Sequence, residues 1–389
     1  MPLRSTLLRA LSGAALVLSA SFAAPTIAAS GSAQPLGSAP SATVEAGSTV
    51  EAGSIVVRAA GDRDLTTGLP APLAGALVRA YADADLTDPA GECTTDAAGT
   101  CTITGLAPGT YHVGPAVDPA GGIFHRLGTV TTSFGGDVPH AEAVTVGEAT
   151  PTTRQLAFRR TNPPFPARCG VRLTLLYDLS GSIDTEEATA MKGASLDFVD
   201  ALAGTPSAIA IASFATAAPA AQNANLAPVP VDTPLGVDTV KQAVTALALP
   251  GGDDRYTNWD AAFRSVAGQS DVVVLFTDGN PTVHGVPAIF PPVLTALDQI
   301  DGGVLSANAV KASGARVLAV GVGNLDELSP HNLAAVSGPV EGSDYAITTF
   351  ADVRTIFRNL SDALCPRPAP PVVVSPAPEP APQLPRFTG

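Results

Sequence analysis

Lysine is scarce in this chain, and charge of any kind is sparse. The 389 residues include three lysines against eighteen arginines, and charged residues make up only 14%. The formal net charge is −14, and a surface of that sign repels a phosphate backbone, so we expect no nucleic-acid partner. A hydrophobic content of 46% is nevertheless enough for real cores, and the length fits two ordered domains with tails.

Long apolar runs are missing after the N-terminal segment. Arg4 and Arg9 precede an apolar run from Leu11 to Ala24, and small residues follow at 26–29. This order predicts a secretory signal peptide over residues 1–29. We therefore expect a secreted or surface-exposed protein with no transmembrane helix in the mature chain. An N-terminal membrane anchor is the alternative, although the run is short for a spanning helix.

The common catalytic patterns are absent as well. The five histidines show no metal-ligand spacing, and we expect them at surface or turn positions. Ser180 and Ser182 lack a Gly-x-Ser-x-Gly context and a His partner that the sequence could identify. The protein is therefore not expected to be an enzyme.

Cysteine is limited to four residues, Cys93, Cys101, Cys169 and Cys365. An even number in an exported chain predicts disulfides, and four cysteines allow three pairings. Cys93 and Cys101 flank the turn before a predicted strand at Thr100–Thr104, so a bond between them would brace that hairpin.

The first half of the chain has the pattern of an all-β sandwich. Residues 30–51 are rich in Ser, Ala, Gly and Pro and are predicted to form a flexible linker. Short apolar runs separated by turn residues then fill residues 52–160, which is typical of a sandwich. The expected strands are Ser54–Ala59, Ala76–Tyr81, Thr100–Thr104, Thr110–Val117 and Arg154–Arg160.

The second half has a different pattern. Residues 161–168 are rich in proline and predict a stiff linker. Apolar strands then alternate with helices over residues 169–365, which predicts an α/β fold with a doubly wound, mostly parallel sheet. Nine prolines in residues 366–389 predict an extended, disordered tail. The expected strands are Val171–Tyr177, Ala208–Phe214, Asp271–Thr277, Arg316–Gly321 and Ser343–Thr348. The expected helices are Glu186–Leu202, Thr239–Leu247, Trp259–Val266, Val293–Gly314 with an interruption at Gly302-Gly303, and Ala351–Leu364.

Oxygen-bearing side chains gather where the predicted strands end. The run Asp178-Leu179-Ser180-Gly181-Ser182 follows the first strand of the α/β part, and Asp278-Gly279 follows a later one. Thr257 comes after a glycine-rich loop that contains Asp253 and Asp254. Ligands of open parallel sheets bind beyond the carboxyl ends of the strands, so these side chains are candidates for one site. The alternatives are that Asp178 and Ser180 only cap the next helix, and that the two loop aspartates are solvated charges.

Two family resemblances follow from these residues. The turn, strand and Pro-Gly turn over Thr95–Tyr111 resemble the prealbumin-like or Cna-B (SpaA-type) sandwich domains of bacterial surface proteins. Many Cna-B domains carry a Lys–Asn isopeptide bond. The first lysine here is Lys192, so that bond cannot form in residues 52–160.

Residues 169–365 resemble a von Willebrand factor A domain, a Rossmann-like fold with a metal-ion-dependent adhesion site. All five family positions are filled, by Asp178, Ser180, Ser182, Thr257 and Asp278. The resemblance implies a divalent cation held by hard oxygen ligands, with Mg²⁺ favoured over Mn²⁺ or Ca²⁺. It also implies a protein partner that completes the shell with an Asp or Glu carboxylate. In this fold the two ends of the domain lie near each other, which favours a Cys169–Cys365 bond.

The resemblance leaves two functions open. One is a bacterial surface adhesin, with the sandwich as a spacer or second binding module. The other is a metal-binding extracellular scaffold that assembles complexes without adhesion. The final Leu384-Pro385-Arg386-Phe387-Thr388-Gly389 is similar to a sortase signal with one residue too many, so association with the cell wall stays open.

Overall fold

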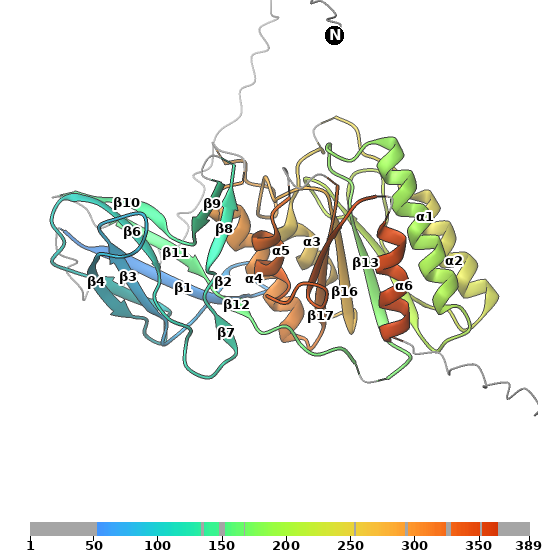
Figure 1. Ribbon diagram of the computed structural model, residues 1–389, viewed down its shortest axis with the longest axis horizontal. Helices are drawn as coiled ribbons and strands as arrows, with labels where there is room; N and C mark the ends of the chain where they lie inside the picture. Colours follow the sequence, from blue (N-terminus) through green and yellow to red (C-terminus); the bar gives the residue numbers. More distant parts are fainter. Residues whose placement is uncertain are drawn as a thin grey trace, which may run out of the picture. The chain divides into compact units, whose positions relative to one another are not determined.

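Two groups of elements make up the part of the chain that the computed structural model describes. That part comprises residues 53–133, 136–147, 152–166, 168–252, 254–291, 295–323, 328–350 and 352–364. Strands β1–β12 form the first group, here the strand module, and β13 to α6 form the second, here the α/β module (Figure 1). The predicted signal peptide (1–29), linker (30–51) and tail (366–389) lie outside the described residues. None of the described helices is both long and apolar enough to cross a bilayer.

The strand module consists of two four-stranded sheets and two short ribbons. One sheet has the order β11-β1-β2, with β5 also paired to β1, and the other has the order β10-β6-β3-β4. Ile55, Val57 and Ala59 alternate along β1 and enter a core that side chains of both sheets share. The strands are β1 (Ile55–Arg63), β2 (Pro70–Pro72), β3 (Leu77–Tyr81), β4 (Pro89–Thr94), β5 (Thr100–Ile103), β6 (Gly109–Pro115), β7 (Phe124–His125), β8 (Thr129–Thr132), β9 (Gly136–Pro139), β10 (Glu142–Val146), β11 (Thr152–Ala157) and β12 (Arg159–Arg160).

The α/β module is built on a six-stranded sheet with the order β15-β14-β13-β16-β17-β18. The strands pair in parallel except for β15, which runs antiparallel to β14. A mixed α/β module with parallel strands agrees with the prediction. The strands are β13 (Arg172–Asp178), β14 (Ala208–Phe214), β15 (Leu226–Pro230), β16 (Val272–Thr277), β17 (Arg316–Val322) and β18 (Tyr345–Thr348).

Helices cover both faces of this sheet (Figure 1). Val272 and Val274 of β16 share one core with α1, α2 and α6, whereas Val273 and Leu275 share another with α3, α4 and α5. Because both faces are covered, every residue of β16 is buried. The helices are α1 (Thr185–Leu202), α2 (Pro234–Ala246), α3 (Trp259–Val266), α4 (Leu297–Ala312), α5 (Pro330–Val336) and α6 (Val353–Leu364).

Helix α4 runs without a break through Gly302 and Gly303, so the predicted interruption is wrong. The glycines serve helix packing instead. A Cβ atom on Gly303 would lie 3.1 Å from the Cβ of Trp259, and one on Gly302 would lie 3.0 Å from the Cβ of His284. Their missing side chains therefore let α3 and α4 approach closely.

The second side of α4 is covered by the strand module. All its residues except Asp298 and Ala312 are buried, because the sheet lies on one side and β1, β11 and β12 on the other. Polar side chains of α4 meet polar groups there. Nε2 of His140 lies 2.7 Å from Oδ1 of Asp301, and Nδ2 of Asn308 donates to the Phe158 carbonyl at 2.6 Å. His140 is 1% exposed, so it does not lie at the surface, although it does lie in a bend between β9 and β10.

The predicted Pro-rich linker lies against the edge of the α/β module. Asn162 exchanges two hydrogen bonds with the backbone of Val317, at 2.8 and 2.9 Å. The Arg316 guanidinium donates to the Pro163 carbonyl and stacks over the Phe165 ring, 4.4 Å from its centroid. The segment is therefore held by contacts as well as by its prolines.

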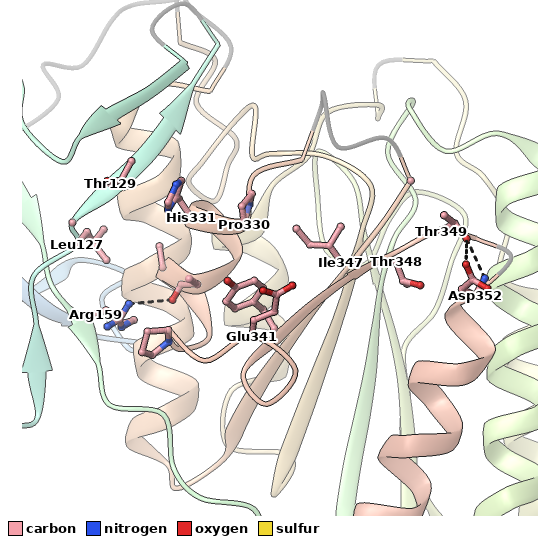
Figure 2. A pocket seen from close by; sticks show the side chains of 16 residues that line it. Leu127, Thr129, Arg159, Pro330, His331, Glu341, Ile347, Thr348, Thr349 and Asp352 are labelled. Atoms are coloured by element: carbon pink, nitrogen blue, oxygen red, sulfur yellow. Dashed lines mark hydrogen bonds between the residues drawn. The ribbon is translucent and has the colours of Figure 1, made fainter.

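A hollow of about 860 Å³ opens between the two modules (Figure 2). Arg159 of the strand module reaches across and donates to the Ala334 carbonyl of α5 at 3.3 Å. The other walls of the hollow come from α5 and the β17–β18 side of the sheet. None of the five candidate site residues lines this hollow.

Cys93 and Cys101 form a disulfide, as predicted, with Cα atoms 5.8 Å apart. Its role differs from the prediction, because Cys93 lies on β4 of one sheet and Cys101 on β5 of the other. The bond therefore joins the two sheets and does not brace one hairpin. Strand β4 was not predicted, since its sequence Pro-Ala-Gly-Glu-Cys-Thr has no apolar alternation and none of its side chains is buried.

Cys169 is also disulfide-bonded. It lies just before β13. Cys365, the partner that the resemblance favours, lies outside the described residues.

Replacement of both Cys93 and Cys101 by serine should destabilise the protein by about 2–3 kcal/mol, because the unfolded chain without the cross-link has more conformational entropy. Urea unfolding followed by circular dichroism would measure this as a lower midpoint. An unchanged midpoint would contradict a stabilising role for the link between the sheets.

Candidate metal site

The five candidate residues meet at the carboxyl ends of two neighbouring strands. Strands β13 and β16 pair in parallel with Tyr177 opposite Phe276, so Asp178 and Asp278 leave the sheet side by side. Ser180 and Ser182 follow β13 in the next turn. Thr257 directly precedes Asn258, the N-cap of α3. Three segments that are remote in sequence therefore converge on one edge of the sheet.

Hydrogen bonds connect all five residues. Thr257 Oγ1 donates to Ser180 Oγ at 3.1 Å, and Ser180 Oγ lies 3.2 Å from Ser182 Oγ. Ser182 Oγ donates to Asp278 Oδ1 at 2.9 Å, and Asp178 Oδ1 accepts from the Ser180 amide at 2.9 Å. Four of the residues are buried, and Ser182 is exposed. The cluster therefore opens to solvent on the Ser182 side.

The helix-capping alternative does not hold. Asp184 caps α1, because its carboxylate accepts from the amides of Glu186 and Glu187, both at 2.8 Å. The Glu187 carboxylate in turn accepts from the Asp184 amide at 2.9 Å, which completes a capping box. Asp178 and Ser180 are therefore not needed to cap this helix.

Neighbouring groups fix the positions of the two aspartate-bearing loops. Thr277 Oγ1 donates to Asp178 Oδ2 at 2.6 Å and orients that carboxylate. The Gly181 amide donates to the Arg255 carbonyl at 2.8 Å, and a Cβ on Gly181 would lie 3.0 Å from the Arg255 Cβ. Glycine at this position therefore lets the turn after β13 lie against the loop before Thr257.

Asp254 does not join the cluster. Its carboxylate accepts from the amides of Ala217 and Ala221 and so holds the loop after β14. Asp254 is a half-buried loop charge, and its hold on these two amides was not predicted. Asp253 lies outside the described residues.

The surroundings of the two carboxylates in the cluster disfavour their ionised forms. Burial raises the pKa of Asp178 to about 6, although hydrogen bonds from Thr277 and Ser180 oppose the shift. Burial and then the charge of Asp178 raise the pKa of Asp278 to about 7, against the hydrogen bond from Ser182. No ion pair among the described residues involves either carboxylate. Two adjacent buried acids thus lack a positive counter-charge.

This donor set fits a hard divalent cation. Two carboxylates and three hydroxyls offer only oxygen, which suits Mg²⁺, Mn²⁺ or Ca²⁺ and disfavours Zn²⁺. The described residues contain no group of three or more His, Cys, Asp or Glu side chains able to hold a metal, so a richer site does not compete with this one. A cation here would be held by Asp178, Ser180, Ser182, Thr257 and Asp278, and would supply the missing positive charge.

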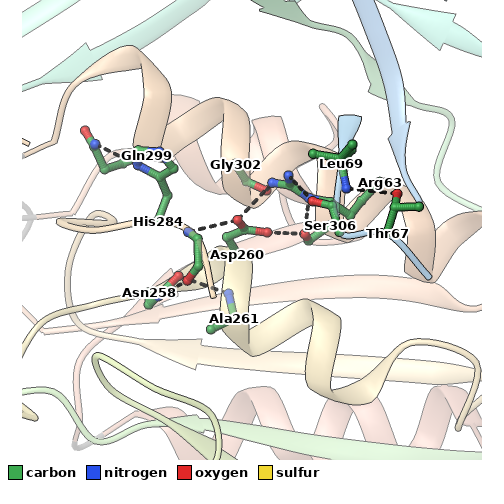
Figure 3. Close-up of polar contacts among 12 residues, drawn as sticks. Arg63, Thr67, Leu69, Asn258, Asp260, Ala261, His284, Gln299, Gly302 and Ser306 are labelled. Carbon is green, nitrogen blue, oxygen red and sulfur yellow. Dashed lines mark hydrogen bonds and ion pairs between the residues drawn. The ribbon is translucent and has the colours of Figure 1, made fainter. Parts of the chain in front are cut away.

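A buried network of polar contacts holds the start of α3, next to Thr257 (Figure 3). Asp260 lies in the first turn of α3 and pairs with Arg63 of β1, with N and O 2.8 Å apart. Its carboxylate also accepts from the Gly285 amide at 3.0 Å and from the Ser306 hydroxyl. The strand module therefore fixes the same helix start that carries Thr257.

Some of these supporting residues could have been recognised from sequence and others could not. Asn258 follows Thr257 and begins a predicted helix, which is the position of an N-cap, and its side chain accepts from the Ala261 amide at 3.0 Å. Arg63 and Asp260 lie in different modules, and no local pattern links them.

Comparisons with known proteins place the chain among distant structural neighbours. No protein-family model and no curated protein matches it. The pilus adhesin SpaC of Lactobacillus rhamnosus GG matches with 13% identity and a TM-score of 0.39 over 53% of this chain and 32% of that one. A von Willebrand factor type A protein of Catenulispora acidiphila matches with 15% identity and a TM-score of 0.34, over 52% and 43% of the two chains.

The PilB minor pilin of Streptococcus sanguinis covers more of the chain, 80% of this one and 92% of that one, with 11% identity and a TM-score of 0.36. This chain spans only about a third of the length of SpaC. At these identities and TM-scores the likenesses carry no argument about function. The proposals below therefore rest on the geometry of the site.

Asp278→Asn should stabilise the metal-free protein at pH 8 by roughly 1–3 kcal/mol, because it removes a buried charge next to Asp178. A carboxyl with a raised pKa favours folding below its ordinary value of 3.8, and this contribution is lost as the pH rises through about 7. The gain should therefore disappear by pH 4. Chemical denaturation at both pH values, without divalent ions, would test this, and an equal effect at both would contradict it.

Arg63→Ala should destabilise the protein by about 3–5 kcal/mol, because it leaves the buried Asp260 carboxylate without its cation. Arg63→Ala combined with Asp260→Ala should recover part of this loss, since no unpaired charge remains. Thermal unfolding of the two variants would measure the difference. If the double variant were no more stable than the single one, an unpaired Asp260 charge would not be the cause of the loss in stability.

Proposed function

We propose that the chain is an exported binding protein whose α/β module is a von Willebrand factor A-like domain with a metal-ion-dependent adhesion site. Residues 169–365 would form this domain with a doubly wound sheet, and residues 52–160 would form a prealbumin or Cna-B-like sandwich. The observation that carries the proposal is the hydrogen-bonded set of two buried carboxylates and three hydroxyls without a counter-charge. Strand order and the helices on both faces support it.

The ligand would be a protein that offers an Asp or Glu carboxylate. Two carboxylates balance the charge of a divalent ion without surrounding it by anionic oxygens, so the ion stays attractive to a third carboxylate. The exposed Ser182 side of the cluster gives that group access from solvent. Mg²⁺ is our first choice of ion, because it binds through few carboxylates and keeps its remaining positions for water or a partner.

The predicted signal peptide supports export, and surface adhesion is the role that we propose. The scaffold alternative, in which the metal holds a complex together without adhesion, shares the same site. Capture of a host or surface protein would separate the two roles.

Mg²⁺ should bind the wild-type chain at a single site and raise its melting temperature, by linkage worth about 2.7 kcal/mol at one hundred times the dissociation constant. Isothermal titration calorimetry in chelated buffer would measure the binding. Asp178→Ala should abolish it, because a charged ligand is lost. Asp197→Ala is the matched control, since Asp197 is an exposed aspartate on α1 whose ion pair in the described part of the chain is with Arg354. Binding of Mg²⁺ or Mn²⁺ to neither wild type nor control would overturn the proposal.

A further inference from the structure

An unusual group of apolar side chains is exposed beside the candidate metal site. Nine large hydrophobic residues are exposed in the described part of the chain, and three of them, Val286, Ile289 and Phe290, lie in the turn that follows β16. Two more, Leu65 and Leu69, lie in the loop between β1 and β2. Exposed apolar side chains that gather in one region mark an interaction surface, whereas scattered ones need no explanation.

The turn that carries the first three is anchored to the metal-site loop. The amides of Thr282 and Val283 both donate to the Thr257 carbonyl, at 2.9 and 3.2 Å. The Asn258 side chain donates to the Gly285 carbonyl at 3.0 Å, and backbone bonds pair His284 with Ile289. The apolar side chains are therefore presented on a hydrogen-bonded hairpin, here the ridge, defined as residues 282–290.

One end of the ridge meets the metal site. Phe290 is 57% exposed and stacks edge-on against Tyr256, with ring centroids 5.1 Å apart. Tyr256 immediately precedes Thr257, and Arg255, which is exposed, lies against Gly181. An aromatic pair thus stands next to one of the expected cation ligands.

The other end of the ridge forms a hollow with the strand module. Val286, Pro287 and Ile289 of the ridge line a cavity of about 460 Å³ together with Leu69 of the strand module. Arg264 of α3 also lines the cavity and has no ion pair among the described residues. Asp260, Asp298 and Asp301 line the cavity too, and each is ion-paired with an arginine of the chain, so Arg264 is the unpaired charge among its described lining residues.

Charge is divided around the site. Glu187 lies in the first turn of α1, a helix that begins three residues after Ser182. The ridge side has Arg255 at one end and Arg264 at the other, in a chain of net charge −14. An acidic ligand would therefore be repelled on the α1 side and attracted along the ridge.

We propose that the partner is an extended protein segment in which acidic side chains flank apolar ones. One carboxylate would reach the metal ion, the apolar side chains would pack on Phe290 and in the hollow between Val286 and Leu69, and a second carboxylate would approach Arg264. The inference rests on the proposed function, because the ion fixes one end of the segment. Beyond that function, the inference gives the path of the bound segment along the ridge and the side chains that determine its sequence preference.

Selection from a phage-displayed library of random peptides, on the full chain in Mg²⁺ with elution by chelator, tests this. Wild type should enrich peptides with an acidic residue followed by aromatic or aliphatic residues. Val286→Ser combined with Phe290→Ser should enrich acidic peptides without the apolar preference. That variant should bind the best wild-type peptide about tenfold more weakly, a loss of about 1.4 kcal/mol. Leu235→Ser, which changes a residue that is 77% exposed on α2, is the matched control and should behave as wild type.

The possible failures are distinguishable. The inference would be overturned if wild type enriched chelator-sensitive acidic peptides without an apolar preference. It would also be overturned if the apolar preference survived in the ridge variant, Val286→Ser combined with Phe290→Ser. Either result would leave the metal-dependent function intact. No chelator-sensitive peptide at all, together with no calorimetric Mg²⁺ binding, would overturn both. Sedimentation that shows a dimer in wild type but not in the ridge variant would make a second copy of the chain the occupant and would also overturn the inference.

Discussion

Two buried carboxylates at the ends of adjacent parallel strands are the constraint on which this edge of the molecule depends. The register of β13 and β16 is fixed by side chains that are buried on both faces of the sheet, so Asp178 and Asp278 cannot move apart without disturbing that core. Hydroxyl groups can hydrogen-bond to these carboxylates but cannot neutralise them. A positive charge from outside the chain would favour the ionised form of both.

The strand module is part of the frame that holds these loops. Helix α4 is buried between the sheet and the strand module, and Arg63 of β1 neutralises Asp260 in the first turn of α3. Since Asp260 also holds the Gly285 amide, one ion pair positions the loop that carries Thr257 and the hairpin that carries Phe290. A spacer that only extends the binding site from a surface would not need such contacts. The strand module instead takes part in setting the geometry of the site.

The sequence was sufficient to place the candidate residues after predicted strands, where parallel sheets bind ligands, and the family resemblance completed the set. That β13 and β16 are neighbours is seen in the structure. The sequence was not sufficient for the contacts between modules. Residues such as His140 and Asn308 are polar, and a polar residue on an amphipathic-looking segment is normally assigned to solvent, yet both are buried in the second interface of α4. Gly302-Gly303 was interpreted as a helix break because helix propensity is local, whereas the close packing of α3 on α4 is not. Because strand β4 was not predicted, the Cys93–Cys101 bond was assigned to one hairpin, whereas it joins two sheets.

The balance of carboxylates and hydroxyls bears on what such a site is for. Each additional carboxylate would hold the cation more tightly and would leave it less attractive to an outside anion. In the proposed site, three neutral hydroxyls would give the opposite compromise, with moderate affinity for the ion and strong attraction for an acidic ligand. The exposed side of the cluster would then decide where that ligand can go, and Glu187 on one flank and Arg255 on the other would give it a direction. A cation that only stabilised the fold would need neither an open side nor an apolar ridge beside it, so the arrangement supports the proposal of a cation that takes part in binding.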